Sequence, residues 1–222
     1  MNPVKLRTSG LVLLFSVLLQ LSAIPLLRAQ QSLPTIVYEQ TFHGSEPEHY
    51  VISVTSDCRG TYKSDQKLTD SADDSFHFDF TLTPLNCAKI FDLTKRARYF
   101  EGQIDSKRKN IASTGMKTLS YKDAQKTTKA TYNYSPILEV QELTAIFQSL
   151  AATMEFGRCL EYDHHYQKLA LDEDLERMEE SSATGVLQEI SAIAPILQKI
   201  IDDPSIMNVV RVRAQRLLAG AK

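Results

Sequence analysis

Residues Ser75–Pro84 read SFHFDFTLTP, and this stretch decides the fold class. Phenylalanine or leucine occupies every second position from Phe76 to Leu82, and polar residues fill the positions between them. Because side chains alternate between the two faces of a strand, the pattern predicts a strand with one buried and one solvated face. Thr83 then supplies an N-cap residue before Pro84 at a first helical position. A helix over 84–98 should therefore pack on the phenylalanine face.

Further strands are predicted on both sides of this stretch. Alternating patterns and strand-forming residues indicate strands over 35–40, 50–55, 60–63, 116–121 and 126–134. The polar, acidic segment 64–74 is typical of a loop. The predicted fold class is α+β, with an antiparallel sheet of about five strands packed by two helices and followed by an α-helical C-terminal region.

A second helix should follow Ser135-Pro136, which repeats the helix start signal. Its apolar positions recur at helical spacing, and they are Val140, Leu143, Phe147, Leu150, Met154 and Gly157. This helix either runs past Cys159 or breaks near Gly157. Leu171, Leu175 and Met178 then predict an exposed acidic helix that ends within 181–185.

The C-terminal residues predict two amphipathic helices, over 186–201 and 205–219, joined by Asp202-Asp203-Pro204. Pro195 in the first helix and the pattern Val210-Arg211-x-x-Ala214-x-x-x-Leu218 in the second resemble a single HEAT-type hairpin. A lone hairpin cannot bury its own apolar face, so it should dock on the preceding helices, on another protomer or on a partner. The apolar positions assigned to its inner face are Leu187, Ile190, Ala194, Leu197 and Ile201, with Val209, Val212, Leu217 and Leu218. The residues expected at an interaction surface are Leu197, Ile201, Arg211 and Arg213.

The segment Tyr50–Val54 (YVISV), the turn after it, and Phe91–Leu93 through Tyr99-Phe100 stand in an order of strands, helix, hairpin and helix. This order resembles a family of secreted bacterial domains of unknown function over residues 35–156. Cys58 replaces a glycine expected in the turn, and the resemblance implies no activity. We divide the chain into a signal segment (1–29), an α+β domain (30–157) and a helical region (158–222).

The N-terminal residues predict export. Lys5 and Arg7 precede an apolar run from Leu11 to Leu21, and a polar chain begins after Ala29. This order is typical of a secretory signal cleaved after Ala29, with a retained anchor as the alternative. The run up to Leu27 is shorter than the about 20 apolar residues of a spanning helix, and no span is expected in the chain after cleavage. The protein should then be periplasmic or extracellular.

Charge bears on the class of partner. Removing residues 1–29 leaves 22 basic and 27 acidic side chains, a formal charge of −5, so nucleic-acid binding is not expected. Residues 95–129 hold ten basic and three acidic side chains, whereas 138–190 hold twelve acidic and three basic ones. Opposite charges at two ends of one molecule favour self-association or a charged partner.

Three cysteines in an oxidising compartment allow one disulfide in three pairings, Cys58–Cys87, Cys58–Cys159 or Cys87–Cys159. If strands 60–63 and 75–82 are antiparallel neighbours, the turn bearing Cys58 and the start of the helix bearing Cys87 lie at the same end of the sheet. This placement favours Cys58–Cys87. The alternative is that Cys87 and Cys159 are small buried apolar residues within helices.

The densest group of functional side chains is 161–166, in which Glu161 lies three and four positions before His164 and His165. Such spacing can serve a metal on a helix, but no second element completes a set of three or four ligands. The sequence contains no G-x-S-x-G, no H-E-x-x-H and no glycine-rich phosphate loop. We therefore expect a secreted or periplasmic non-enzymatic protein, either a protein–protein interaction module or an envelope-associated module, with no cofactor. The alternative is a small-ligand or metal-binding protein, or a hydrolase, with its site near these three residues.

Signal removal can be tested directly. Mass spectrometry of the exported protein should find a chain that starts at about Gln30, because the basic start, the apolar run and the polar onset occur in the required order. A membrane fraction that retains Met1 would instead establish an anchor.

Overall fold

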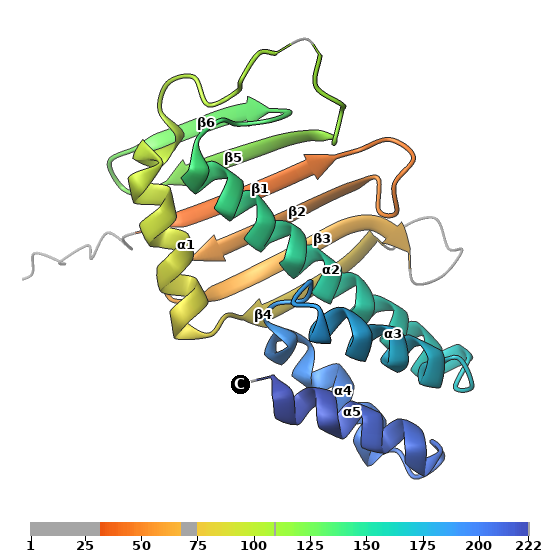
Figure 1. The fold of residues 1–222 in the computed structure, drawn as a ribbon. Helices are drawn as coiled ribbons and strands as arrows, with labels where there is room; N and C mark the ends of the chain where they lie inside the picture. The colour runs from red at the N-terminus through yellow and green to blue at the C-terminus, as the bar shows by residue number, and fades with distance from the viewer. Residues whose placement is uncertain (1–31, 68–74, 109, 222) are drawn as a thin grey trace, which may run out of the picture. The chain divides into compact units, whose positions relative to one another are not determined.

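The computed structural model describes residues 32–67, 75–108 and 110–221, and its central element is one antiparallel sheet (Figure 1). The strands are β1 (Thr35–Thr41), β2 (His49–Thr55), β3 (Arg59–Lys67), β4 (Ser75–Thr81), β5 (Met116–Lys122) and β6 (Thr127–Tyr132). They lie in the spatial order β4-β3-β2-β1-β5-β6, so β4 and β6 form the two edges. The predicted α+β class is confirmed, with a 6-stranded sheet where the sequence predicted about five strands. The signal segment lies outside the described residues.

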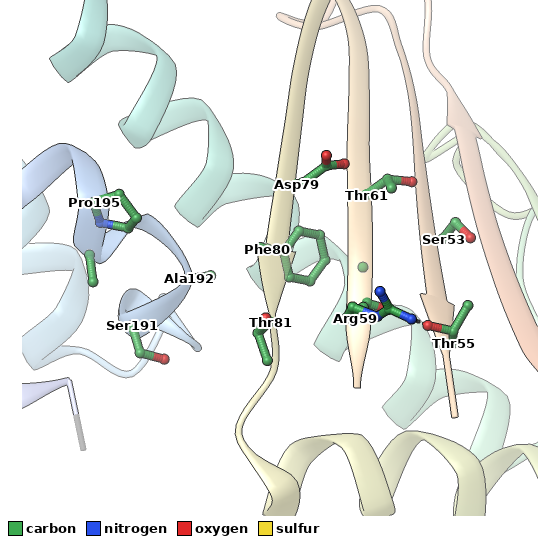
Figure 2. A pocket seen from close by; sticks show the side chains of 12 residues that line it. Ser53, Thr55, Arg59, Thr61, Asp79, Phe80, Thr81, Ser191, Ala192 and Pro195 are labelled. Atoms are coloured by element: carbon green, nitrogen blue, oxygen red, sulfur yellow. Dashed lines mark hydrogen bonds between the residues drawn. The ribbon is translucent and has the colours of Figure 1, made fainter. Parts of the chain in front are cut away.

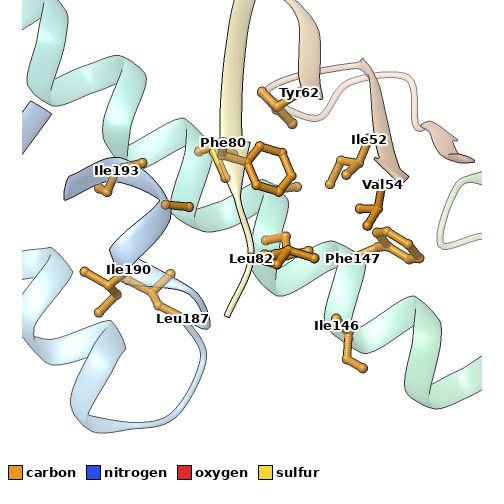
Figure 3. Close-up of a cluster of buried hydrophobic side chains, with 14 of the residues drawn as sticks. Ile52, Val54, Tyr62, Phe80, Leu82, Ile146, Phe147, Leu187, Ile190 and Ile193 are labelled. Carbon is orange, nitrogen blue, oxygen red and sulfur yellow. The ribbon is translucent and has the colours of Figure 1, made fainter. Parts of the chain in front are cut away.

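Helices α1 (Pro84–Arg96) and α2 (Leu138–Tyr166) cover one face of the sheet (Figure 1). Aliphatic and aromatic side chains of the strands point to this face and meet the helices in a single core. Its members include Ile52, Val54, Tyr62, Phe80, Leu82 and Phe147 (Figure 3). The opposite face carries polar side chains that are largely half-buried or exposed, among them Ser53, Thr61, His77 and Asp79. The alternation in the sequence therefore gives the sheet one packed face and one solvated face.

The apolar stripe predicted for α2 is confirmed, since all six of its residues are buried. The helix continues through Cys159 to Tyr166, so the sheet and the C-terminal helices share one continuous element. Gly157 lies where this helix meets the chain near Ile193, because a Cβ at Gly157 would stand only 2.8 Å from the Ile193 Cγ2 atom. None of the helices in the described ranges combines the length and the apolarity needed to cross a bilayer.

Helix α1 starts at Pro84 as predicted, but its capping contact, the start of α2 and the end of β3 differ from the sequence prediction. The Thr83 hydroxyl does not cap α1; it donates instead to the Glu189 carboxylate, 106 positions away. Helix α2 begins only at Leu138, because the Ser135 hydroxyl accepts a hydrogen bond from the Ile137 amide (3.3 Å) before the first turn. Strand β3 extends to residue 67, where the sequence predicted a loop from residue 64 onward; the rest of that predicted loop, 68–74, lies outside the described residues.

The chain reverses after α1 through a left-handed turn that the sequence prediction missed. Helix α1 ends at Arg96, and the next element, η1 (Arg98–Phe100), has φ values of 55°, 55° and 64° at its three residues. Such values are uncommon for residues with a Cβ atom. Tertiary contacts hold the turn, since Phe100 is buried and the Tyr99 ring packs on the Tyr121 ring with centroids 4.7 Å apart.

Four elements follow α2, and the last two form the C-terminal hairpin. The four are α3 (Leu171–Ala183), η2 (Ile190–Ile193), α4 (Ala194–Asp202) and α5 (Asn208–Gly220). Helix α4 contacts α2 and α5 contacts α3, so the hairpin docks on the preceding helices of the same chain. The first predicted helix, 186–201, was too long: α4 starts at Ala194, which places Pro195 in its first turn, where proline needs no amide hydrogen.

The packing face of α5 agrees with the prediction at Leu217 and Leu218 and differs at the two valines. The buried positions are Val210, Ala214 and Leu217, whereas Val209 and Val212 are 51% and 41% exposed. The row Val210, Ala214 and Leu217 therefore faces the core, and Val209 and Val212 face solvent.

The residues predicted for an interaction surface serve mainly inside the chain. Leu197 is fully buried, and Ile201 is half-buried against the core. The Arg213 guanidinium donates to three carboxylates of α3, on Asp172 (2.8 Å), Glu176 (3.1 Å) and Glu179 (2.8 Å). Arg211 is half-buried and its nearest polar contact is the Asn208 side chain, at 3.4 Å. Helices α4 and α5 thus use Leu197 and Arg213 within the chain, and the interaction surface itself stays a prediction.

Cys58 and Cys87 form a disulfide with Cα atoms 5.5 Å apart, the pairing that the sequence favoured, and Cys159 is free. Cys58 has a φ of 67° in the turn between β2 and β3. This is the left-handed region, which glycine enters without strain. The turn therefore explains why a glycine is expected there, and the disulfide ties it to the first turn of α1.

Burial of the C-terminal hairpin can be measured with two matched substitutions. Leu197→Ala should lower the free energy of unfolding by about 2–5 kcal/mol, because it leaves a cavity in the core. Val212→Ala should change it by less than about 0.5 kcal/mol, because that side chain is largely solvated. Urea denaturation of both variants checks this, and equally small effects would contradict docking of the hairpin on α2 and α3.

Candidate functional site

Glu161, His164 and His165, the residues of the predicted metal or hydrolase site, contact three different partners. The Glu161 carboxylate lies 3.3 Å from the Lys199 ammonium. The His164 Nε2 atom lies 3.0 Å from Asp203 Oδ2, and the His165 ring meets the Tyr166 ring edge-on. Adjacent helical residues point in different directions, which separates the two imidazoles. Within the described ranges, no group of three or more His, Cys, Asp or Glu side chains could hold a metal ion.

Ser205 and Lys168 meet beside His164, but their hydrogen bonds make a structural contact and not a catalytic one. The Ser205 hydroxyl donates to Asp203 Oδ1 (2.6 Å), and the Lys168 ammonium donates to both Asp203 (2.9 Å) and Ser205 (2.5 Å). The Ser205 hydroxyl and the Lys168 ammonium hold the pKa of the Asp203 carboxyl well below its usual range. A serine nucleophile needs a neighbouring base with a free lone pair, and a protonated lysine has none. The cluster therefore ties the turn between α4 and α5 to the end of α2.

A groove of about 660 Å³ lies where the solvated face of the sheet meets η2 and α4 (Figure 2). Hydroxyl groups from three strands line it, on Ser53, Thr55, Thr61 and Thr81. Arg59 and Asp79 add one charge of each sign. The far wall comes from η2 and the start of α4, with Ser191, Ala192, Ala194 and Pro195. The groove thus combines hydrogen-bonding groups on the sheet with a small apolar wall.

Strand alternation explains the composition of the groove. The register places Thr61 opposite Ser53 on β2 and opposite Asp79 on β4, so these three side chains share the solvated face. Gly60 pairs with Phe80 in the same register, and a Cβ at Gly60 would collide with the Phe80 ring. Because Gly60 has no side chain, the Phe80 ring of edge strand β4 has room to lie over β3.

The wall of the groove is positioned by Glu189, a residue that sequence reasoning missed. Its side chain is 8% exposed, and its backbone has a φ of 57°. The carboxylate accepts hydrogen bonds from the Thr83 amide (3.1 Å), the Thr83 hydroxyl (2.5 Å), the Asn86 side chain (2.5 Å) and the Ser191 hydroxyl (3.2 Å). A negative charge is favourable at a helix N-terminus. Glu189 thus fixes η2 to the first turn of α1, and no local pattern around it in the sequence signals this role.

A second, smaller cavity of about 270 Å³ lies between α2 and α3, away from the sheet. Its lining is strongly polar and includes Arg158, Asp163, Asp174 and Arg177. None of these residues was predicted as part of a site. The acidic composition of α3 was visible in the sequence, but the meeting of its first turns with the end of α2 was not.

The role of Glu189 can be tested by removing its charge. Glu189→Gln keeps the size of the side chain but presents an NH₂ group to donors that need an acceptor, so it should lower the free energy of unfolding by about 1–3 kcal/mol. Glu180→Gln, at an exposed position of α3, serves as the control and should have an effect within about 0.5 kcal/mol of zero. Thermal or urea unfolding of both variants gives the comparison, and equal stability would show that Glu189 does not fix η2.

The comparisons with known proteins assign no family to this chain. No protein-family model matches it, and no curated protein matches it. The resemblances to secreted bacterial domains and to a HEAT-type hairpin therefore stay predictions.

Proposed function

We propose that this chain is an exported, non-enzymatic binding protein that holds an extended segment of a partner protein in the groove beside β4. The observation that carries the proposal is the groove itself, a hollow of about 660 Å³ formed by edge strand β4, its neighbours and the η2–α4 wall. Its volume falls within the range of about 300–1,000 Å³ that ligand sites occupy.

The chemistry of the lining suits a polypeptide. Hydroxyl groups both donate and accept hydrogen bonds, as the amide and carbonyl groups of an extended chain require. In the described residues, the hydrogen bonds of the β4 backbone run to β3, and none connects β4 with η2. An edge strand with unpaired backbone groups is where an extended segment adds to a sheet. The wall residues Ala192 and Pro195 would contact apolar side chains of such a segment.

The disulfide supports the exported part of the proposal. Cys58–Cys87 suits an oxidising compartment outside the cytoplasm, because cytosolic thiols are kept reduced. The basic and apolar start of the sequence supports the same location, either periplasmic or extracellular.

The contacts of the charged residues favour protein binding over a metal site or a hydrolase site on α2. Glu161, His164 and His165 each have a separate contact within the chain, which does not assemble a metal site or a hydrolase there. Three acidic residues of α3 are bound by Arg213, so part of the negative charge that would favour self-association is neutralised inside the molecule. A heterologous protein partner is therefore the better candidate than a second copy.

Two tryptophan substitutions test the groove. We expect a library of random peptides on phage, selected on the oxidised protein, to yield ligands that bind wild type in fluorescence anisotropy. Thr81→Trp fills the groove from β4 and should weaken their binding by about tenfold or more, equivalent to about 1.4 kcal/mol. Thr127→Trp places the same side chain at an exposed threonine of the other edge strand, β6, and should leave the affinity unchanged.

Two outcomes would contradict the proposal. One is a selection that enriches no peptide over rounds in which a control protein performs normally. The other is a set of peptides that binds wild type and both tryptophan variants with equal affinity.

A further inference from the structure

The cavity between α2 and α3 is lined by a carboxylate that has no protein partner within the described part of the chain. Asp163, in the last turns of α2, is 8% exposed and lines the cavity. Its carboxylate makes no hydrogen bond or ion pair with any residue in the described ranges. A charged group needs hydrogen bonds, so the Asp163 oxygens must find them in what occupies the cavity, either water or a ligand.

Two acids close to Asp163 are already paired. Glu155 Oε2 accepts from the Arg158 guanidinium at 2.6 Å, one turn before the cavity. Asp174, at the start of α3, forms an ion pair with Arg177. Both arginines line the cavity, but each is engaged with another carboxylate. Glu173, the third acid of the lining, is exposed to solvent, so Asp163 is the buried acid of this cavity that has no donor among the described residues.

The remaining lining defines what could supply that donor. Acids outnumber bases, since Asp163, Asp174 and Glu173 face two arginines, which favours a cation over an anion. A metal ion is a poor match, because the described residues hold no group of three suitable ligands. The Tyr162 ring also lines the cavity, and an aromatic face attracts a cation such as an ammonium group.

We propose that this cavity binds a small primary amine in its protonated form, with the ammonium group donating hydrogen bonds to the Asp163 carboxylate. The volume of about 270 Å³ lies just below the usual range for drug-sized ligands and fits a short aliphatic amine. The alkyl part of the amine lies along Ala170 and the Tyr162 ring. This site is separate from the groove beside β4, and neither proposal depends on the other.

Binding should depend on pH through Asp163. Burial raises the pKa of this carboxyl, although the charges of Arg177 and Arg158 act in the opposite direction. A protonated carboxyl attracts an ammonium group poorly, so the affinity should rise as the pH rises through the pKa of Asp163 and then level off. The charged and titratable groups that α2 and α3 place around it are Glu155, Arg158, Cys159, Tyr162, Glu173, Asp174 and Arg177.

The direct test is calorimetric titration of the full chain, as exported, with n-butylamine. We expect saturable binding of the amine at millimolar concentrations or below, and none of 1-butanol, which has the same length without the charge. Asp163→Asn should weaken amine binding about tenfold or more, equivalent to about 1.4 kcal/mol. Glu180→Gln removes one exposed acid of α3 outside the cavity and should leave the affinity unchanged.

The thermal midpoint of the free protein separates binding from folding. Asp163→Asn should melt at the same temperature as wild type or higher, because it removes a buried charge that has no partner. Wild-type affinity measured over the acid range in which the protein stays folded gives a second readout that needs no variant and should fall toward low pH, since the amine itself stays protonated there. Equal binding of butanol, undiminished binding by Asp163→Asn, or an affinity that rises toward low pH would each overturn the proposal.

Discussion

The buried carboxylate of Glu189 joins two parts of the chain that are 106 residues apart. It meets the backbone amide and the hydroxyl of Thr83 at the start of α1, where the helix dipole favours a negative charge. The Cys58–Cys87 disulfide anchors the same first turn to the sheet. Because both links converge on one end of α1, the η2–α4 wall stands at a fixed position beside β4. The groove depends on that position.

Helix α2 connects the sheet to the second cavity through a row of polar contacts. The Tyr132 hydroxyl pairs with Thr144 (2.6 Å), and the Tyr62 hydroxyl donates to Glu155 (2.6 Å) farther along the helix. Burial raises the pKa of Tyr132 to about 12, so its hydroxyl keeps its proton at physiological pH. Glu155 in turn holds Arg158, which lines the cavity containing Asp163. One helix thus contacts the sheet through polar groups and lines the proposed amine site two turns later.

Much of the architecture could be predicted because it follows local periodicity. The strand alternation around Phe76–Leu82 gave the sheet its buried face, and the stripe along α2 gave the covering helix. The sites could not be predicted in the same way. Glu189 and Asp163 matter because of what surrounds them in space, and both look like ordinary solvated acids in the sequence. The spacing within the cluster 161–166 suggested one shared site, whereas in the fold its side chains contact separate partners. The helix start at Thr83-Pro84 was predicted correctly, but the partner of the Thr83 hydroxyl was not, since its acceptor lies in a distant segment.

The left-handed turn at Arg98–Phe100 has a consequence for the order in which the chain folds. Left-handed conformations cost roughly 1–2 kcal/mol per residue with a Cβ atom, so this turn is not stable by itself. Its stabilising contacts come from the β5–β6 hairpin, where the Thr128 hydroxyl donates to the Tyr99 carbonyl (2.5 Å) and the Lys126 ammonium lies 4.6 Å from the Tyr99 ring centroid. The hairpin must therefore form before the reversal after α1 becomes fixed. During synthesis α1 emerges first, and its C-terminal end can pack stably on the sheet only after residues about thirty positions downstream have also emerged.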